Sequence, residues 1–337
     1  MGIRRVQKVG KSTFTVSLPQ EWVRNKNLTP KTEVDVELQH DGSISINTLE
    51  SMKSSKEPRE ITIVAKEPDA GYVIRKAVSA YINNYDIMHI DLSKVSLENG
   101  GKEKIRKYIK TKMAGGEIIE ETLGRITIQI LLKPSEFPLQ KLLLRMAIMA
   151  KDMMVDVSRG MEEGDVNILK DVIERDEDVD KLYYMASRWL NFIVSDHGAL
   201  FDFGMKQIRD CLEYRLIFRN MERVADHVQR ISLNYISILE TVDDSITRSL
   251  ITNLESSMNV FTRSVNCIQS GSLQEANKAI HDARKVVIVL EELVQKVIEK
   301  EGNTKNIASL MIIIDSIRRI SEYGIGISEI AFNLHSE

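Results

Sequence analysis

Four carboxylates fall at or near apolar positions in two stretches with helical periodicity. Asp176 and Asp180 are four residues apart in VIERDEDVDKL, and Glu222 and Asp226 are four apart in RNMERVADHVQRI. Because a helix advances about 100° per residue, each pair lies on one helical face. The first pair falls within the apolar stripe of its helix, and the second lies along the edge of another stripe. Carboxylates that face each other from bundle helices can hold a hard cation through oxygen ligands.

Carboxylates beside an apolar stripe need compensation, because an unpaired buried carboxylate is costly and otherwise takes up a proton. One compensation is a divalent or trivalent metal ion, such as Mg²⁺, Mn²⁺, iron or zinc. The candidate ligands are the four acids above and one earlier acid: Asp176, Asp180, Glu222, Asp226 and Asp156. The alternative is an internal ion-pair network without metal, formed by Arg219 and Arg215 on the same strip. Both interpretations stay open, and His227 is expected to point away from the acids.

The elements that position these acids are helices. From residue 139 onward the apolar residues recur with helical period, and glycine or polar breaks divide them into two sets of three helices, 139–241 and 245–335. The segment at 162–173 aligns with 269–280 at an offset of 107 residues (269 − 162), with glycine on glycine. This self-similarity predicts an internal repeat of one three-helix unit.

The second copy of this repeat keeps the apolar frame and loses three of the four acids. The aligned pairs are Asp176 with Ala283, Asp180 with Val287, Glu222 with Arg318 and Asp226 with Glu322. The bundle therefore does not need the acids in order to fold. We interpret them as belonging to a site, or to a partner contact, that is specific to the first copy.

The first fifty residues have a different character. Period-two strand patterns in VQKVGKSTFTVSL and in TEVDVELQ…SISINT flank a short helical pattern, PQEWVRNKNL. Residues 4–26 hold six cations against the single acid Glu21: Arg4, Arg5, Lys8, Lys11, Arg24 and Lys26. On a chain of net charge −3 such a local cluster indicates contact with phosphate backbones. Simple solvation of a short segment would explain it equally well.

A polar linker at 51–60 separates this region from a small α+β module, residues 59–134. Strand patterns at 61–65, 87–92 and twice within 117–133 alternate with helical patterns at 70–84 and 102–113. The module could be a rigid spacer, a dimer contact or a ligand sensor.

The bulk composition indicates an intracellular protein. Cys211 and Cys267 lie in apolar-periodic segments and are expected to be buried and reduced. The basic N-terminus precedes no apolar core, and the longest apolar run, 309–317, is too short to span a bilayer. The Glu-x-x-His pattern of di-iron bundles and the usual catalytic triads are missing. We therefore expect a cytoplasmic protein that is not an enzyme and does not insert into the membrane.

The helical region resembles the PhoU family of phosphate-signalling proteins, which are built from two three-helix repeats. The residues that match its third-helix signature are Arg219, Glu222, Arg223, Val224, Asp226 and His227, and Asp176 and Asp180 match its second-helix acid pair. The resemblance covers about 139–334 and is weaker in the second repeat. It implies a regulator of phosphate uptake that binds metal through these acids and contacts a phosphate transporter ATPase or a sensor protein.

The first fifty residues are similar to the SpoVT–AbrB swapped-hairpin DNA-binding domain. The similarity lies in the strand leading to Gly-Lys, the Leu-Pro-x-Glu-Trp turn, the Leu-Thr-Pro-Lys stretch and the Asp-Gly hairpin. It implies an obligate homodimer that interlocks its hairpins, with Trp22 and Val23 in the core. DNA contacts are then expected from the basic arm: Arg4, Arg5, Lys8, Lys11 and Arg24. The stretch 10–19 is longer than in short bacterial members, and Val23 stands where a second arginine is common.

Together these resemblances predict a mainly α protein of an archaeal-type fusion. Two three-helix-bundle repeats follow a small β swapped-hairpin domain and a small α+β module. The expected function is transcriptional regulation of phosphate uptake and intracellular phosphate homeostasis. The alternative is an adaptor that regulates a transporter or sensor by protein contact without binding DNA.

Overall fold

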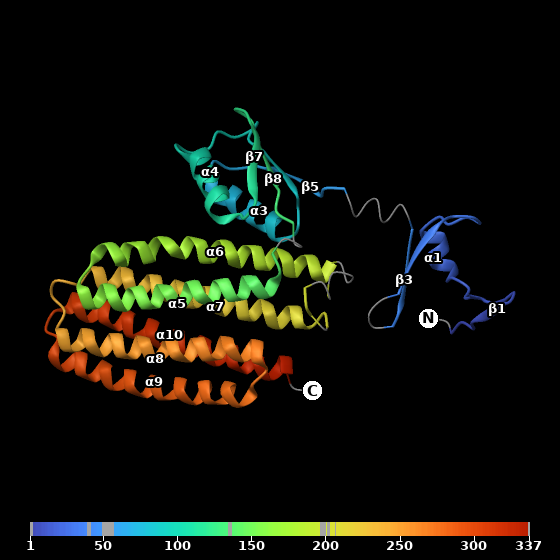
Figure 1. The fold of residues 1–337 in the computed structure, drawn as a ribbon. Helices are drawn as coiled ribbons and strands as arrows, with labels where there is room; N and C mark the ends of the chain where they lie inside the picture. Colours follow the sequence, from blue (N-terminus) through green and yellow to red (C-terminus); the bar gives the residue numbers. More distant parts are fainter. Residues whose placement is uncertain are drawn as a thin grey trace. The chain divides into compact units, whose positions relative to one another are not determined.

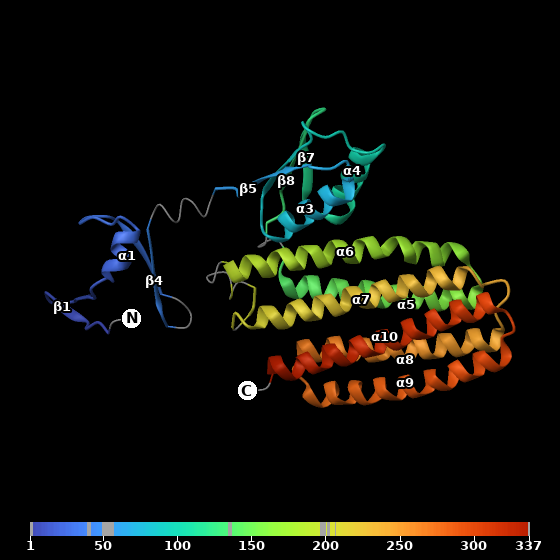
Figure 2. The same ribbon diagram turned by 180° about the vertical axis from the view of Figure 1, so that it is seen from behind.

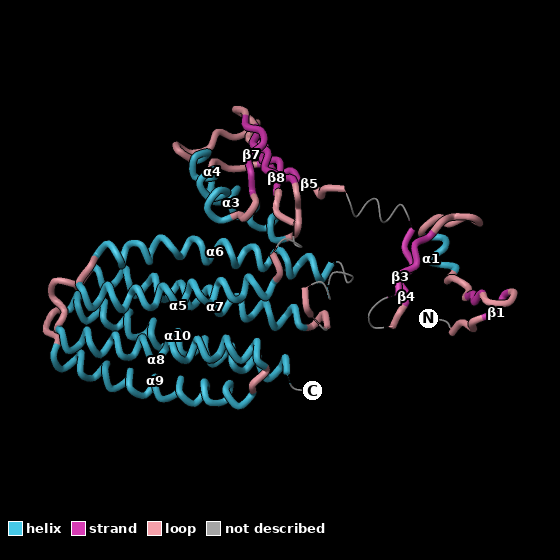
Figure 3. Tube along the Cα trace, viewed as in Figure 1, coloured by secondary structure: helices cyan, strands magenta, loops and turns pink. Residues whose placement is uncertain are grey.

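The computed structural model describes residues 3–38, 42–48, 57–133, 137–195, 200, 203–205 and 207–335. It is mainly helical, with strands confined to the N-terminal 130 residues (Figure 3). The chain forms two compact units, Met1–Pro58 and Arg59–Glu337, which are described separately. Most of the predicted linker at 51–60 and most of the predicted break at 197–204 lie outside the described residues.

The N-terminal unit consists of two hairpins around a short helix, as the strand patterns predict. Its elements are β1 (Gln7–Val9), β2 (Thr13–Thr15), α1 (Gln20–Asn25), β3 (Val34–Leu38) and β4 (Ile44–Thr48). β1 pairs antiparallel with β2, and β3 pairs antiparallel with β4. Gly10 lies in the first turn with φ +69°, a conformation that residues with a side chain adopt at a cost.

This unit buries little apolar surface in a single chain. Trp22 and Val23, the predicted core residues, are only half-buried, and α1 has no fully buried residue. Phe14 is 68% exposed and Leu38 is 77% exposed. A unit of this size buries only a small core by itself, and these apolar side chains are exposed in the single chain.

The middle module is a four-stranded sheet with two helices, in the order β5 (Glu60–Val64), α3 (Ala70–Ile82), β6 (Ile87–Asp91), α4 (Gly101–Lys112), β7 (Gly116–Glu121) and β8 (Arg125–Ile130). The strand order is β5-β6-β8-β7, with β5 parallel to β6 and the other pairs antiparallel. The core lies between the sheet and the helices, with Val73 and Tyr81 of α3 and Ile105 of α4 fully buried.

Six long helices form the C-terminal bundle, and they run side by side in Figures 1 and 2. They are α5 (Leu139–Glu163), α6 (Val166–Ser195), α7 (Asp210–Ile236), α8 (Asp244–Ser270), α9 (Leu273–Lys300) and α10 (Thr304–His335). α5 and α8 both end at a glycine with φ +68°, Gly164 and Gly271. These two C-caps are 107 residues apart (271 − 164), which confirms the predicted repeat offset.

The two three-helix sets pack on each other through α7 against α10 and α5 against α8. Within the second set, α8 and α10 approach closely at small residues. Ser257 bonds to Ser321 at 2.9 Å, and Ser264 bonds to Ser328 at 2.9 Å. Between these pairs, a Cβ added at Gly324 would lie 2.7 Å from Val260. Small side chains therefore set this helix spacing.

The middle module packs directly on α6. The sequence did not indicate what this module contacts. The guanidinium of Arg188 in α6 is 5% exposed and donates to the carbonyls of Tyr81 and Tyr85 at 2.7 and 2.9 Å. It also pairs with Asp86 at 2.8 Å. Removing one partner from a buried pair leaves the other unsatisfied, so these bonds fix the module on the bundle.

Two further sequence expectations concern the whole chain. Cys211 and Cys267 are both buried and free, as predicted, and burial raises the pKa of the Cys211 thiol to about 11. Among the described helices, none combines the length and the apolar composition that crossing a lipid bilayer requires.

Candidate functional site

Three of the predicted acids meet where α6 and α7 pack together. Asp180 of α6 and Glu222 and Asp226 of α7 each offer a carboxylate oxygen, and these oxygens all lie within 4.8 Å of one another. Glu222 is buried, and the two aspartates are half-buried. We call these three residues the acid cluster. The helical spacing in the sequence is thus converted into one compact group of oxygen ligands.

Asp176 lies one helical turn before the acid cluster and is buried. Its Oδ2 accepts a hydrogen bond from the Gln229 amide at 2.9 Å, whereas its buried Oδ1 has no hydrogen-bond partner within the described structure. Burial, together with the charges of Asp180 and Asp226, raises the pKa of Asp176 to about 7. The charges of the acid cluster therefore affect the pKa of Asp176, although Asp176 is not one of its three residues.

Glu222 shows the same incomplete compensation. Its Oε1 accepts from Arg219 at 2.8 Å, but its Oε2 is buried without a hydrogen bond in the described part of the chain. Arg223 lies 3.8 Å from that oxygen, which is too long for a hydrogen bond. Burial raises the pKa of Glu222 to about 7, with a further contribution from Asp226, and the two arginines only partly oppose this rise.

The other two acids each have one cationic partner. Arg223 pairs with Asp226 at 3.0 Å, and burial still raises the pKa of that carboxyl. Lys112, from α4 of the middle module, pairs with Asp180 at 2.8 Å and is itself mostly buried. Lys112 was not predicted as part of the site, because nothing in the sequence relates α4 to α6 across 68 residues.

Both sequence interpretations describe part of this geometry. An ion-pair network exists, with Arg219 as predicted and Arg223 in the place expected for Arg215. It is incomplete, because three cations (Lys112, Arg219, Arg223) face four carboxylates (Asp176, Asp180, Glu222, Asp226) and two buried oxygens stay unpaired among the described residues. A site with excess carboxylate oxygens and unpaired buried acceptors suits an additional cation.

The fifth candidate ligand lies apart from the acid cluster. Asp156 of α5 pairs with Arg175 at 2.5 Å and with Arg159 at 3.3 Å. His227 also lies outside the cluster, in the direction expected from the helical wheel. Its ring centroid is 5.8 Å from that of Tyr323 in α10, and burial lowers its pKa to about 4.

The equivalent face of the second repeat is chemically different. Ala283 is buried at the position of Asp176. Arg318, at the position of Glu222, pairs with Asp315 at 2.5 Å and with Glu322 at 2.6 Å. These acids are half-buried and satisfied by arginine, so the unbalanced carboxylates belong to the first repeat.

The predicted DNA-contacting residues all lie in the N-terminal unit. Lys8 is in β1, Lys11 is in the turn that follows, and Arg24 is in α1. Arg4 and Arg5 precede β1, and all five side chains are exposed.

Comparison with known proteins identifies a PhoU domain at residues 143–234. This segment runs from α5 to α7 and contains the whole acid cluster. The match supports the resemblance to the PhoU family and covers about a quarter of the chain. No curated protein matches the chain.

Two solved structures are similar to the helical region. PhoU from Pseudomonas aeruginosa shares 14% identity with a TM-score of 0.49, covering 58% of this chain and 94% of that protein. The phosphate transport system regulatory protein PhoU from Streptococcus pneumoniae shares 13% identity with a TM-score of 0.50, covering 59% and 93%. The second likeness establishes a shared helical fold.

The raised pKa values of Asp176 and Glu222 predict a pH dependence of stability. Between about pH 4 and pH 7 the folded protein holds protons on these acids that the unfolded chain releases, so the free energy of unfolding falls as pH rises and levels off above this window. In the absence of metal, the variant Asp176→Asn/Glu222→Gln should show a smaller decrease in the free energy of unfolding over this pH range. At pH 8 its free energy of unfolding should exceed that of wild type by on the order of 1 kcal/mol. Urea denaturation in EDTA measures both quantities.

The matched control is Asp315→Asn/Glu322→Gln in the second repeat, whose acids are paired with arginine. It should keep the wild-type pH profile between about pH 4 and pH 7. A double variant at Asp176 and Glu222 that is less stable than wild type at pH 8 would contradict the assignment of unpaired charge to these two acids.

Proposed function

We propose that this protein is a cytoplasmic DNA-binding regulator of phosphate uptake and intracellular phosphate homeostasis, and not an enzyme. The observation that carries the proposal is the PhoU domain match at 143–234, which encloses the acid cluster and Asp176, four carboxylates that face only three cations. In this proposal the helical region binds a metal ion and contacts a phosphate transporter ATPase or a sensor protein. The N-terminal unit binds DNA.

The cation part of the proposal places a metal ion among Asp180, Glu222 and Asp226. Oxygen atoms bound to one Mg²⁺ or Mn²⁺ lie about 3–4 Å apart, so oxygens within 4.8 Å need only small side-chain rotations to coordinate one ion. Asp176, one turn away, would complete the set or stay in the surrounding shell. Lys112 already neutralises Asp180, so an incoming ion competes with this ammonium group.

Adding Mn²⁺ should therefore stabilise the protein through the acid cluster. A ligand at one hundred times its Kd contributes about 2.7 kcal/mol, which corresponds to a rise in Tm of at least about 2 °C. We expect this rise in metal-free wild type at about pH 7.5, its loss in Asp180→Asn/Glu222→Gln, and its retention in Asp315→Asn/Glu322→Gln. Equal shifts in all three proteins would contradict a specific site at the acid cluster.

The DNA part of the proposal rests on the N-terminal unit. Five exposed cations lie just before β1, on the first hairpin and on α1, and its similarity to swapped-hairpin domains concerns the same residues. The exposed Phe14 and Leu38 side chains support a homodimer, because a second copy that exchanges hairpins would cover them. A dimer also doubles the number of cations available to one duplex.

Removing the arm charges should abolish DNA binding. The variant carries five replacements by alanine, at Arg4, Arg5, Lys8, Lys11 and Arg24. Each phosphate contact that is lost reduces the slope of log affinity against log salt by about 0.9, so affinity for a random duplex should fall at least about tenfold at low salt. Fluorescence anisotropy with a labelled duplex measures both quantities.

The control replaces five exposed lysines of the second unit by alanine: Lys107, Lys110, Lys141, Lys151 and Lys170. This control has the same net charge as the arm variant and should bind DNA as wild type does. The DNA-binding proposal would be contradicted if wild type did not bind DNA, or if both variants lost DNA affinity equally. The alternative would then be the adaptor function, in which the protein acts on a transporter or sensor by protein contact alone.

A further inference from the structure

The middle module has one sheet edge that no described element covers along its length. β5 is the outer strand in the order β5-β6-β8-β7. The carbonyl of Arg59 accepts from the amides of Asp86 and Ile87 at 2.7 and 3.2 Å, and the amide of Ala65 donates to Asp91 at 2.9 Å. Residues 59 and 65 thus point their main-chain groups toward β6. The main-chain N–H and C=O groups of successive residues point to alternate sides of a strand. Every second residue between 59 and 65 therefore directs these groups away from β6.

The outward-pointing residues are Glu60, Thr62 and Val64. In the described structure their N–H and C=O groups form no main-chain bonds outside the sheet ladder. From Glu60 to Val64 the edge is about 13 Å long, which is the length of about five residues of an extended peptide. An open edge of this kind can pair with another strand by main-chain hydrogen bonds.

The opposite edge of the same sheet is protected. β7 contains a register shift between Ile118 and Glu120, and it carries Glu117, Glu120 and Glu121. Bulges and charged side chains are common ways to block an edge strand. β5 has a regular register with β6 and no proline. The two edges therefore differ, and β5 alone is left suitable for an added strand.

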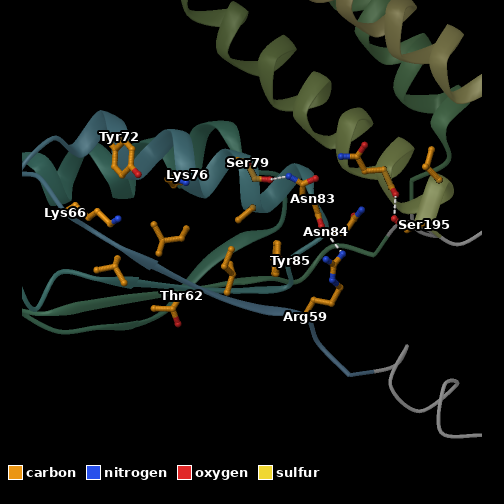
Figure 4. Close-up of a pocket in the computed structure, with 16 residues that line it drawn as sticks. Arg59, Thr62, Lys66, Tyr72, Lys76, Ser79, Asn83, Asn84, Tyr85 and Ser195 are labelled. Atoms are coloured by element: carbon orange, nitrogen blue, oxygen red, sulfur yellow. Dashed lines mark hydrogen bonds between the residues drawn. The ribbon is translucent and has the colours of Figure 1, made fainter. Parts of the chain in front are cut away.

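A cavity of about 720 Å³ runs along β5, between this strand and α3. In Figure 4, Tyr72 and Lys76 of α3 lie opposite Thr62 of β5, and Ser195 of α6 lies near the Arg59 end. We call this cavity the β5 groove. Its volume falls in the range of sites that bind ligands in proteins.

The β5 groove is basic. Its lining contains the cations Arg59, Lys66 and Lys76 and no aspartate or glutamate. The Arg59 guanidinium lies 4.7 Å from the centre of the Tyr85 ring and donates to the carbonyl of Asn83 at 3.0 Å. Within the described residues, none of these three cations forms an ion pair through its side chain. Their charge is available to a ligand.

We propose that the β5 groove binds an extended acidic segment of a partner protein, which adds as a fifth strand beside β5. Main-chain bonds to Glu60, Thr62 and Val64 would hold the segment. Its acidic side chains, on the face toward α3, would meet Lys66 and Lys76, and its alternate apolar side chains, on the opposite face, would contact Val64, which is 40% exposed. A small anion would use the cations and leave the strand edge unpaired.

The test uses the full-length protein and a fluorescein-labelled ten-residue peptide that alternates glutamate and valine. Thr62→Pro removes one outward N–H and leaves the β5–β6 ladder intact, because proline is tolerated where the N–H faces outward. Thr62→Ala keeps that N–H. By fluorescence anisotropy we expect saturable binding to wild type and Thr62→Ala, and at least about a tenfold weaker Kd for Thr62→Pro.

A second comparison tests the contribution of charge, with Lys66→Glu/Lys76→Glu as the groove variant. Its control is Lys107→Glu/Lys110→Glu, which changes the net charge by the same amount on the exposed side of α4. Only the first pair should weaken binding. Hydrogen exchange adds a direct readout, since the amides of Thr62 and Val64 should become protected when the peptide binds. A peptide that alternates lysine and valine should not bind.

Three outcomes would overturn the proposal. They are no saturable binding of the acidic peptide, equal affinity for Thr62→Pro and Thr62→Ala, and complete displacement of the peptide by millimolar inorganic phosphate or ATP. The last outcome would mean a small-anion site. If Thr62→Pro fails to fold, peptides N-methylated on alternate residues make the same comparison, because only methylation on the side that faces β5 should prevent binding.

Discussion

Buried carboxylate charge is the physical constraint that distinguishes the first helical repeat from the second and determines which side chains surround the candidate site. Four carboxylates meet at the contact of α6 and α7, and desolvation makes the ionised forms of three of them, Asp176, Glu222 and Asp226, costly. Lys112, Arg219 and Arg223 offset part of that cost and leave two buried oxygens unpaired in the described structure. The second repeat packs the same helical frame without this imbalance, so the acids are an addition to the fold and not a requirement of it.

The same charges connect the bundle to the middle module. Lys112 supplies the cation of Asp180 from α4, while the buried Arg188 of α6 holds the other end of the module through main-chain carbonyls. Any ion that enters the acid cluster therefore acts on a contact between two parts of the chain. This arrangement gives the proposed cation site a physical route to the module, since a change at Asp180 changes what Lys112 contacts.

The sequence predicted the local part of this structure and not the distant part. Helical periodicity placed Asp180, Glu222 and Asp226 on facing surfaces, because spacing along one helix fixes the face. Arg223 pairs with Asp226 at the same i,i+3 spacing that Arg219 has with Glu222, so the spacing was sufficient to identify it, although Arg215 was expected in its place. Lys112 could not be found, because its partner depends on how the module packs on α6. Trp22 and Val23 were predicted as core, yet a single chain leaves them half-buried, and the sequence pattern alone does not give the degree of burial.

The most direct test of a cation at the acid cluster is the metal content of the purified protein, measured by inductively coupled plasma mass spectrometry after growth in metal-replete medium. Wild type should carry at least about one equivalent of Mg²⁺, Mn²⁺, iron or zinc per chain. Asp180→Asn/Glu222→Gln should lose it while retaining its helical circular dichroism, and Glu322→Gln should keep it. Metal-free wild type, together with a destabilised Asp180→Asn/Glu222→Gln variant, would contradict the cation site and establish the acids as a purely structural ion-pair network.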